Sequence, residues 1–318
     1  MKVIGFDAPG GPEVLRAFDI AEPAVGPNQV RVRVLASAVN PTDVVTRNGT
    51  VHWAYVGAGV EPPFIPGWDA AGIVDDADPA TGYVAGDQVL AIKVPVVEGG
   101  GTYAEKVVVA AESVTGLPRG HDFASGSTVL MNGLTALQVL DNLEGLAGGV
   151  IAVTGGAGVL GGYVIELAKL KGFRVIADAS APDRSLLETL GADVVVNRGP
   201  DVAAHIRRHA PGGVDALVDC AVLGNVVAPA VRAGGTYVAV RPAEVFGGAI
   251  DPQYDLKTET VWVGPDIARK PRLDYLSDLA STGGLTLRVA RELPADDAAE
   301  AHRLLERGGV RGRLVLRF

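Results

Sequence analysis

The stretch VIAVTGGAGVLGGYVIELAKLK, residues 150–171, decides the fold. A short apolar run leads into a cluster of glycines, and a helix-period segment follows. Gly156, Gly158 and Gly161 satisfy the pattern G-x-G-x-x-G. In this pattern the glycines permit a tight turn, a close approach of the backbone to a pyrophosphate, and packing of the helix on its strand. The exposed N–H groups of that helix would face the diphosphate, so the stretch predicts a dinucleotide site.

The same region also raises the question of a membrane span. Residues 145–165 carry no charged side chain and are long enough to cross a bilayer. Glycines interrupt this run, and a backbone broken there would leave polar groups unpaired in lipid. Glu166 and Lys169 follow at once. We therefore predict a dinucleotide turn rather than a membrane span.

Composition and charge narrow the class of protein. A chain of 318 residues with 48% hydrophobic and 20% charged residues is typical of a globular protein, and its length favours two domains. The net charge of -9 disfavours binding to nucleic acid or to an anionic membrane. The first residues, MKVIGFDAPGG, contain no long apolar segment, so we expect a cytoplasmic protein. The single cysteine, Cys220, excludes an internal disulfide, and we expect it to be inert packing.

The pattern of expected strands and helices changes near residue 121. Before it, short apolar runs alternate with turns and predict a compact β-domain, with strands at 30–35, 72–74, 88–92 and 104–109. After it, strands and helices alternate, which implies right-handed βαβ units and a doubly wound parallel sheet. The strands expected there are 150–153, 174–177, 194–196, 217–219 and 235–240. The expected helices are 128–140, 158–171, 184–190, 202–209, 226–231, 271–282 and 296–307, before a final strand at 313–318.

Several blocks of the sequence carry a family resemblance in order along the chain. They include SAVNPTDVVTRNG (37–49), PFIPGWDAAGIV (63–74), NGLTALQVL (132–140), LGADVVVNR (190–198) and HRLLERGGVRGRLVLRF (302–318). The sequence resembles the medium-chain dehydrogenase/reductase superfamily, and within it the zinc-free, zeta-crystallin-like quinone oxidoreductase group. The resemblance implies an α/β protein with a GroES-like β-domain at 1–118, completed by 264–318, and a Rossmann NADP-binding domain at 119–263.

Members of that superfamily either bind a catalytic zinc ion or lack one, and this is the first question for the present chain. Zinc-dependent members carry a ligand cysteine where this chain has Asn40, and a ligand histidine where it has Trp68. An amide or an indole does not replace these ligands, because zinc prefers thiolate, imidazole or carboxylate. Asp69 alone is no metal site, and we expect it to have a structural role. We therefore predict no metal, which disfavours alcohol oxidation but allows hydride transfer to an activated acceptor.

The residues after the second Rossmann strand bear on the choice of cofactor. Relatives that prefer NAD place an acid there, which binds the ribose 2′-OH. In this chain that position is Ala179, followed by Ser180 and Arg184, and Arg198 lies where the family often has a tyrosine beside the 2′-phosphate. A hydroxyl and two guanidiniums suit a phosphate clamp and favour NADPH. Two alternatives stay open: both arginines are solvated surface residues, or Asp178, one place earlier, selects NAD.

The resemblance assigns further cofactor contacts position by position. Asn40 and Thr135 match residues that approach the nicotinamide end in the family, and Arg313 matches a basic residue near the cofactor. Ala221, Val240 and Val263 are expected at the carboxyl ends of strands, where ligands bind in open α/β sheets. The glycine turn contributes Gly156, Ala157, Gly158, Val159 and Leu160.

The proton donor departs from the family pattern. Enoyl-thioester reductases of this superfamily carry a tyrosine where this chain has Val51. His52 and Tyr55 lie nearby, and either would protonate an enolate if their loop folded inward. The alternative is that Trp53, Tyr55 and Trp68 only line an aromatic substrate wall.

These inferences together predict a zinc-independent, NADPH-dependent reductase that transfers hydride to a quinone or an α,β-unsaturated carbonyl, with a small apolar substrate. The alternatives are an enoyl reductase or tailoring enzyme of a natural-product pathway, and an NADPH-binding protein with little turnover. The family often pairs Rossmann edge strands, so we expect a homodimer, for which residues 260–263 (TVWV) are a suitable edge. The physiological substrate stays undetermined at this point.

Overall fold

The computed structural model describes residues 1–246 and 248–318, and contacts divide them into two compact units. Unit 1 comprises residues 1–131, 264–283 and 287–318, and unit 2 comprises 132–263 and 284–286. The expected boundary lay at 118/119. The difference arises because α3 (Phe123–Gly126) packs against strands β3 and β4 of unit 1.

Unit 2 is built on a six-stranded parallel sheet with the order β10-β9-β8-β11-β12-β13. This is the strand order of the dinucleotide-binding fold, so the predicted doubly wound sheet is confirmed. Its strands are mostly apolar runs because both faces are covered. The strands are β8 (Val150–Thr154), β9 (Arg174–Ala179), β10 (Val194–Asn197), β11 (Val214–Asp219), β12 (Val231–Ala239) and β13 (Lys257–Thr260).

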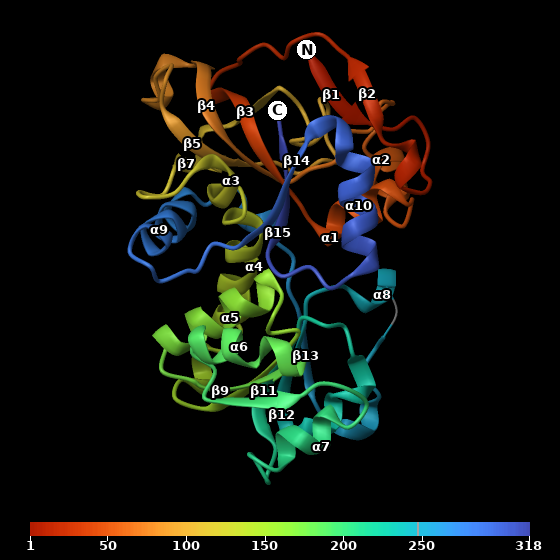
Figure 1. Cartoon of the computed structure of the whole chain (residues 1–318), viewed down its shortest axis with the longest axis vertical. Coiled ribbons are helices and arrows are strands. Elements are labelled where there is room, and N and C mark those ends of the chain that lie inside the picture. The colour runs from red at the N-terminus through yellow and green to blue at the C-terminus, as the bar shows by residue number, and fades with distance from the viewer. Residues whose placement is uncertain (247) are drawn as a thin grey trace. The chain divides into compact units, whose positions relative to one another are not determined.

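Helices flank this sheet, as Figure 1 shows. α5 packs against β8 and β9, α6 against β9 and β10, and α7 against β10. The expected helix at 226–231 is wrong. Two 3-10 turns, Gly224–Val226 and Ala228–Ala230, stand in its place, because Pro229 lacks the N–H that a continuous helix needs. The helices are α4 (Leu130–Asp141), α5 (Val159–Leu170), α6 (Arg184–Thr189), α7 (Val202–Arg207) and α8 (Ala243–Phe246).

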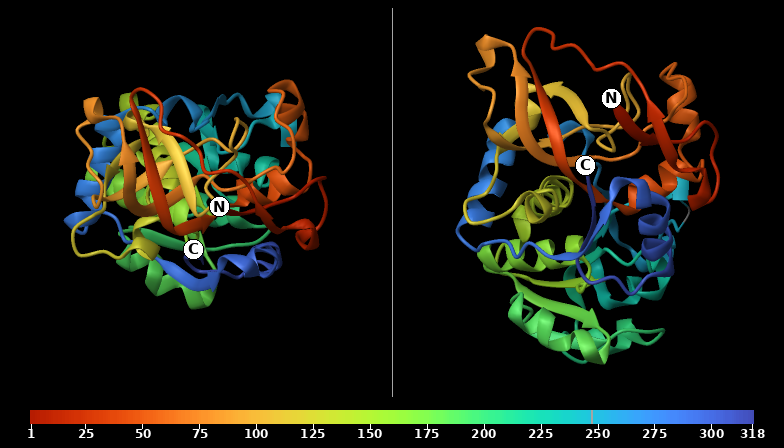
Figure 2. Two further views of the ribbon diagram at one scale, coloured as in Figure 1. Left: turned by 90° about the horizontal axis from the view of Figure 1, so that it is seen from above. Right: turned by 45° about the horizontal axis from the view of Figure 1, so that its top comes forward.

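Unit 1 is built on a seven-stranded sheet with the order β14-β15-β3-β4-β5-β7, in which β6 also pairs with β3. The last strand, β15, pairs antiparallel with β3, so the C-terminal segment lies beside the N-terminal strands (Figures 1 and 2). This return to the first domain is what the family resemblance implied. The strands are β3 (Gln29–Val39), β4 (Asp69–Ala77), β5 (Gln88–Ile92), β6 (Lys106–Ala110), β7 (Val114–Gly116), β14 (Val289–Pro294) and β15 (Arg313–Arg317).

A separate two-stranded sheet and several helices complete unit 1. The sheet pairs β1 (Lys2–Gly5) with β2 (Arg16–Asp19). The segment expected as a loop around residues 50–60 contains a short helix, α2. The helices are α1 (Pro41–Arg47), α2 (His52–Gly57), α3, α9 (Lys270–Ser281) and α10 (Ala298–Arg307). None of the described helices combines the length and apolar character of a membrane span.

Candidate active site

The glycine turn joins β8 to α5, and packing explains its glycines. A Cβ on Gly161 would lie 2.4 Å from the carbonyl oxygen of Gly155, and one on Gly156 would lie 2.9 Å from Leu187 Cδ2. Gly155 itself has φ +64°, which favours glycine. Gly158 is the N-cap of α5 and has no side chain of its own to cap the helix. The helix therefore begins with backbone N–H groups at its positive end, as an anion site requires.

The side chain of Asp178 is hydrogen-bonded to the backbone of this turn. Its Oδ1 accepts a hydrogen bond of 2.7 Å from the backbone N–H of Gly155, and the residue is only 5% exposed. Burial raises the pKa of Asp178, and the hydrogen bond and the charge of Arg198 partly oppose that rise. The carboxylate thus has a structural role in the turn. This role explains the presence of an acidic residue at position 178 without any contact to the ribose of a cofactor. It therefore weakens the alternative that Asp178 selects NAD.

The expected phosphate clamp is brought together only in part. Ser180 and Arg198 follow the paired strands β9 and β10, and the backbone N–H of Arg198 donates to the carbonyl of Ala179 at 3.1 Å. Arg198 is exposed, and Ser180 Oγ donates to Asp183 at 2.5 Å.

Arg184 is hydrogen-bonded within the fold, which makes it a weaker candidate than Arg198 for the phosphate. Its Nη1 donates to the carbonyl of Val195 at 2.7 Å, and its Nη2 lies 3.4 Å from Asn197 Oδ1. These bonds tie α6 to β10 through Nη1 and, at a longer distance, Nη2. Arg184 therefore has a structural role, and Ser180 and Arg198 remain as the predicted phosphate contacts.

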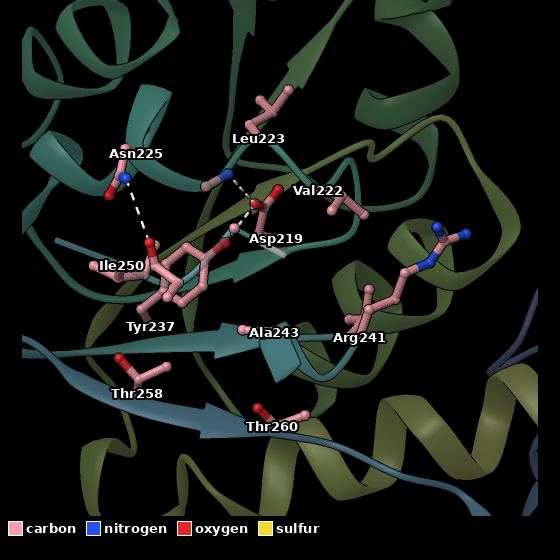
Figure 3. A pocket seen from close by; sticks show the side chains of 15 residues that line it. Asp219, Val222, Leu223, Asn225, Tyr237, Arg241, Ala243, Ile250, Thr258 and Thr260 are labelled. Atoms are coloured by element: carbon pink, nitrogen blue, oxygen red, sulfur yellow. Dashed lines mark hydrogen bonds between the residues drawn. The ribbon is translucent and has the colours of Figure 1, made fainter. Parts of the chain in front are cut away.

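A pocket of about 150 Å³ lies at the carboxyl ends of β11, β12 and β13, and Figure 3 shows its lining. Its polar centre is Asp219, which accepts hydrogen bonds from Thr154 Oγ1 and Tyr237 OH at 2.5 Å and from the N–H of Gly224 at 2.8 Å. In Figure 3 the phenol of Tyr237 and the carboxylate of Asp219 point toward each other. These bonds fix the loop after β11, which also lines the pocket.

That loop contains an unusual backbone conformation at Val222, which lines the same pocket. Val222 has φ +57°, a region that β-branched residues rarely adopt because Cβ approaches the backbone. Strain of this kind is often found where a site fixes the chain. The loop after β11 is therefore held both by hydrogen bonds and in a strained conformation.

Most of the predicted cofactor residues reach one edge of unit 2, because the carboxyl ends of parallel strands lie together. Ala221 donates its N–H to Thr154 Oγ1 at 3.1 Å, and Val240 lines the pocket. Val263 lies three residues past β13 and is 3% exposed, and Thr135 lies on α4. The residues that follow strand ends on this edge are Gly156, Ala157, Gly158, Val159, Leu160, Ser180, Arg198, Ala221 and Val240. Cys220 precedes Ala221, and burial raises the pKa of its thiol.

Asn40 and Arg313, the other two predicted contacts, belong to unit 1. Asn40 follows β3 and is the N-cap of α1, where its backbone N–H donates to Asp43 Oδ2 at 2.8 Å. Its side-chain Nδ2 donates to Asp69 Oδ2 at 2.9 Å, and Asp69 Oδ1 accepts from the N–H of Met131 at 2.8 Å. Arg313 on β15 is 7% exposed, and its charge lowers the pKa of Asp69. The amide of Asn40 is thus oriented by a buried carboxylate.

Asp43 and Asp69 form a pair of buried acids that the sequence did not single out as functional. Burial raises the pKa of Asp43 to about 7 and that of Asp69 to about 6, although hydrogen bonds to both carboxylates oppose the rise. Asp43 also accepts from the N–H of Gly67 at 2.9 Å and from Tyr103 OH at 3.3 Å. Tyr103 OH in turn lies 3.2 Å from Nε2 of the buried His302. The only sequence signal for Asp43 was its place three residues after an Asn N-cap.

The residues at the two zinc-ligand positions do not fit a catalytic zinc ion. The amide nitrogen of Asn40 is engaged with Asp69, and Trp68 presents an indole that is 3% exposed. Within the described ranges, no cluster of three or more His, Cys, Asp or Glu side chains is placed to hold a metal. Zinc would need thiolate, imidazole or carboxylate donors that these positions lack.

The two expected proton donors, His52 and Tyr55, lie on α2, and the structure does not support the role expected for Tyr55. Tyr55 is fully buried, with its ring 5.1 Å from that of Phe64, and burial raises its pKa. A core tyrosine does not reach a substrate, so the structure does not support Tyr55 as a donor. The ring of His52 packs edge-on against Phe64 at 5.2 Å. The expected aromatic wall is also absent as a unit, because Trp53 is 65% exposed whereas Tyr55 and Trp68 are buried.

Known proteins match both parts of this chain. A model of the alcohol dehydrogenase GroES-like domain matches residues 26–119, and a zinc-binding dehydrogenase model matches 190–316. The quinone oxidoreductase of Coxiella burnetii is 30% identical, with a TM-score of 0.85, over 100% of this chain and 99% of that one. A mycobacterial protein solved in complex with NADPH is 26% identical, with a TM-score of 0.85, over 100% of both chains. The NADPH-dependent alkenal/one oxidoreductase of Arabidopsis thaliana is 30% identical over 76% of this chain and 63% of its own length.

A GroES-like unit joined to a parallel sheet with a dinucleotide turn defines an oxidoreductase of the dehydrogenase/reductase class. The chain belongs to the medium-chain dehydrogenase/reductase superfamily, in its quinone oxidoreductase group.

Proposed function

We propose that this oxidoreductase uses NADPH to reduce a quinone or an α,β-unsaturated carbonyl without zinc. The observation that carries the proposal is the glycine turn at the start of α5, where the carbonyl of Gly155 leaves no room for a Cβ on Gly161 and the N-cap residue is a glycine. Relatives named for quinone reduction and for NADPH-dependent alkenal/one reduction support the choice of acceptor.

Residues of unit 2 would hold the cofactor. The N–H groups at the start of α5 suit the diphosphate, and Asp178 fixes the turn that presents them. Ser180 and Arg198 follow the adjacent strands β9 and β10 and offer a hydroxyl and a guanidinium to a 2′-phosphate. Bound NADPH would supply a hydride, and the protein would supply orientation and exclusion of water.

The side chains at positions 40 and 68 support zinc-independent chemistry. Without a Lewis acid, reaction of a simple alcohol or ketone is disfavoured. Quinones and enones are activated by their own conjugation, so positioning beside the reductant is sufficient for much of the rate advantage. Asn40, held by Asp69, is our proposed polar contact at the nicotinamide end.

We also propose a homodimer through the free edge of β13. This strand pairs only with β12 within the described chain, and all four of its residues are exposed. The segment expected to form this edge, residues 260–263, begins at the last residue of β13. Trp262, within this segment, is 54% exposed. Light scattering of the wild type and of Trp262→Glu tests the proposal, since a dimer through this edge should dissociate in the variant. Cytoplasmic location stays a prediction.

The deciding experiment measures NADPH oxidation with quinones, small enones and enoyl thioesters, each repeated with NADH. We expect turnover with quinones or enones and a preference for NADPH. Turnover only with enoyl thioesters would favour an enoyl reductase or tailoring enzyme. Tight NADPH binding without acceptor-dependent oxidation would favour a binding protein and would contradict the proposal.

A further inference from the structure

Lys93 is a largely buried lysine, and no partner for its ammonium lies among the described residues. It follows β5 directly, and its backbone N–H donates to the carbonyl of Trp68 at 2.9 Å. Its side chain is largely buried, yet within residues 1–246 and 248–318 its ammonium makes no hydrogen bond or ion pair. Buried lysines are normally paired, because an unpaired ammonium loses its hydration without compensation. A lysine kept in this state calls for a functional explanation.

The sheet of unit 1 places Lys93 at the same edge as Asn40 and Trp68. β3 and β4 are antiparallel, with Ser37 opposite Ala70, so the end of β3 lies beside the start of β4. β4 and β5 are also antiparallel, with Asp69 opposite Ile92. Asn40 after β3, Trp68 before β4 and Lys93 after β5 therefore leave the sheet at one edge.

The described neighbour of the ammonium is the backbone at Gly99. A Cβ on Gly99 would lie 3.5 Å from Lys93 Nζ, so the three consecutive glycines at 99–101 begin close to the ammonium. Burial alone lowers the pKa of Lys93 to about 8. The ionisable neighbours along the chain and the adjacent strand are Glu98, which is exposed, and Asp69, whose carboxylate is engaged with Asn40 and Met131. Neither of these acids contributes to the lowered pKa of Lys93.

We propose that Lys93 is the proton donor of the reductase, a role that rests on the proposed function. With NADPH bound, the acceptor would gain a hydride, with its two electrons, and would become an enolate or a hydroquinone anion. One N–H bond of the Lys93 ammonium then breaks and its proton passes to this anion. The electron pair of that bond stays on Nζ, and water returns the proton to the amine.

The chemistry of lysine suits this role at this position. A general acid works best when its pKa lies near the working pH, and burial brings the pKa of a lysine toward that range. The flexible stem lets Nζ follow the reacting oxygen or carbon. Because Tyr55 lies in the core, Lys93 is better placed than Tyr55 for this role.

Two substitutions separate a proton donor from a simple positive charge. Lys93→Met should lower kcat for an enone by about 100-fold, the size expected for general acid catalysis, and leave the affinity for NADPH unchanged by titration. Lys93→Arg keeps the charge but holds its proton too tightly, so it should be similarly impaired. Lys106→Met is the matched control, because Lys106 pairs with Glu22 and Asp75 and should leave kcat unchanged.

The pH dependence provides a second readout. The wild-type kcat should fall above about pH 8, where Lys93 loses its proton, and Lys93→Met should lack this limb. In the protein without cofactor, stability to urea should rise between about pH 8 and 10.5, because only the unfolded state then keeps this proton. Lys93→Met should lack that rise.

The outcomes distinguish the two proposals. An active wild type together with a Lys93→Met variant of unchanged kcat and pH profile would overturn the role of Lys93 alone. An Arg variant with full activity would also overturn it in favour of a charge effect. A wild type that reduces no acceptor would instead overturn the proposed function, and the proton-donor role would fall with it.

Discussion

The side-chain amide of Asn40 donates a hydrogen bond of 2.9 Å to Asp69, and both residues are almost fully buried. The other oxygen of Asp69 accepts from the backbone of Met131. A buried carboxylate therefore sets the orientation of Asn40, the residue at the position where zinc-dependent relatives carry a cysteine.

Asp69→Asn should disturb this arrangement. An amide nitrogen would replace one acceptor oxygen, so two donors would face each other, or the bond to Met131 would be lost. We expect a loss of about 2–3 kcal/mol in the free energy of unfolding, as for a hydrogen bond to a charged group. Urea denaturation at neutral pH measures it. Asp76→Asn, at an exposed position on the same strand, should change stability by less than about 0.5 kcal/mol. Equal stability of D69N and wild type would contradict the orienting role.

His302 should make the protein sensitive to acid. Burial lowers the pKa of His302 to about 3, from an ordinary value of 6.5. Between these values the unfolded state binds a proton that the folded state does not, so the contribution of His302 to stability is full above pH 6.5 and is lost as the pH falls toward 3. Asp43 and Asp69, whose pKa values are raised, act with the opposite sign, so the wild-type curve alone does not isolate His302.

The difference between the wild type and His302→Gln isolates this effect. The variant keeps a polar partner for Tyr103 and removes the titration, so its stability should fall less steeply from pH 6.5 toward pH 4. Urea unfolding at several pH values measures the two slopes. Parallel curves for the two proteins would show that His302 is not held neutral by burial.

The sequence predicted the architecture well because the signals for it are local. The apolar run, the glycines and the helix period at 150–171 are enough to define β8, the turn and α5. Side-chain partners are not local. Arg184 is bound to Val195 and Asn197 across the sheet edge, and Tyr55 packs on Phe64, so neither role was visible in a linear pattern. Lys93 was missed for the same reason, since its burial depends on the loop at 94–101.

Val222→Gly should stabilise the protein. Val222 has φ +57°, which costs a β-branched residue about 1–2 kcal/mol, whereas glycine adopts it freely. Glycine also loses more entropy on folding, so we expect a net gain of about 0.5–1 kcal/mol, measured by urea denaturation. Val226→Gly is the matched control, because Val226 lies in a 3-10 turn of ordinary conformation and should lose stability. Destabilisation of V222G would mean that the exposed valine contributes packing that exceeds the strain.

Arg198 and Arg184 form a matched pair for testing cofactor choice. The side chain of Arg184 donates a hydrogen bond to the backbone of β10, whereas the side chain of Arg198, just after β10, is exposed. Arg198→Ala should weaken NADPH binding by about tenfold or more and leave NADH binding unchanged, since only NADPH carries the 2′-phosphate that a guanidinium would pair with. Arg184→Ala should instead lower stability, by about 1–2 kcal/mol for the lost hydrogen bonds, and keep the ratio of the two affinities. Fluorescence titrations with both nucleotides and urea denaturation measure these effects. A ratio that changes in R184A but not in R198A would return the phosphate contact to Arg184 and would require its guanidinium to leave Val195 when NADPH binds.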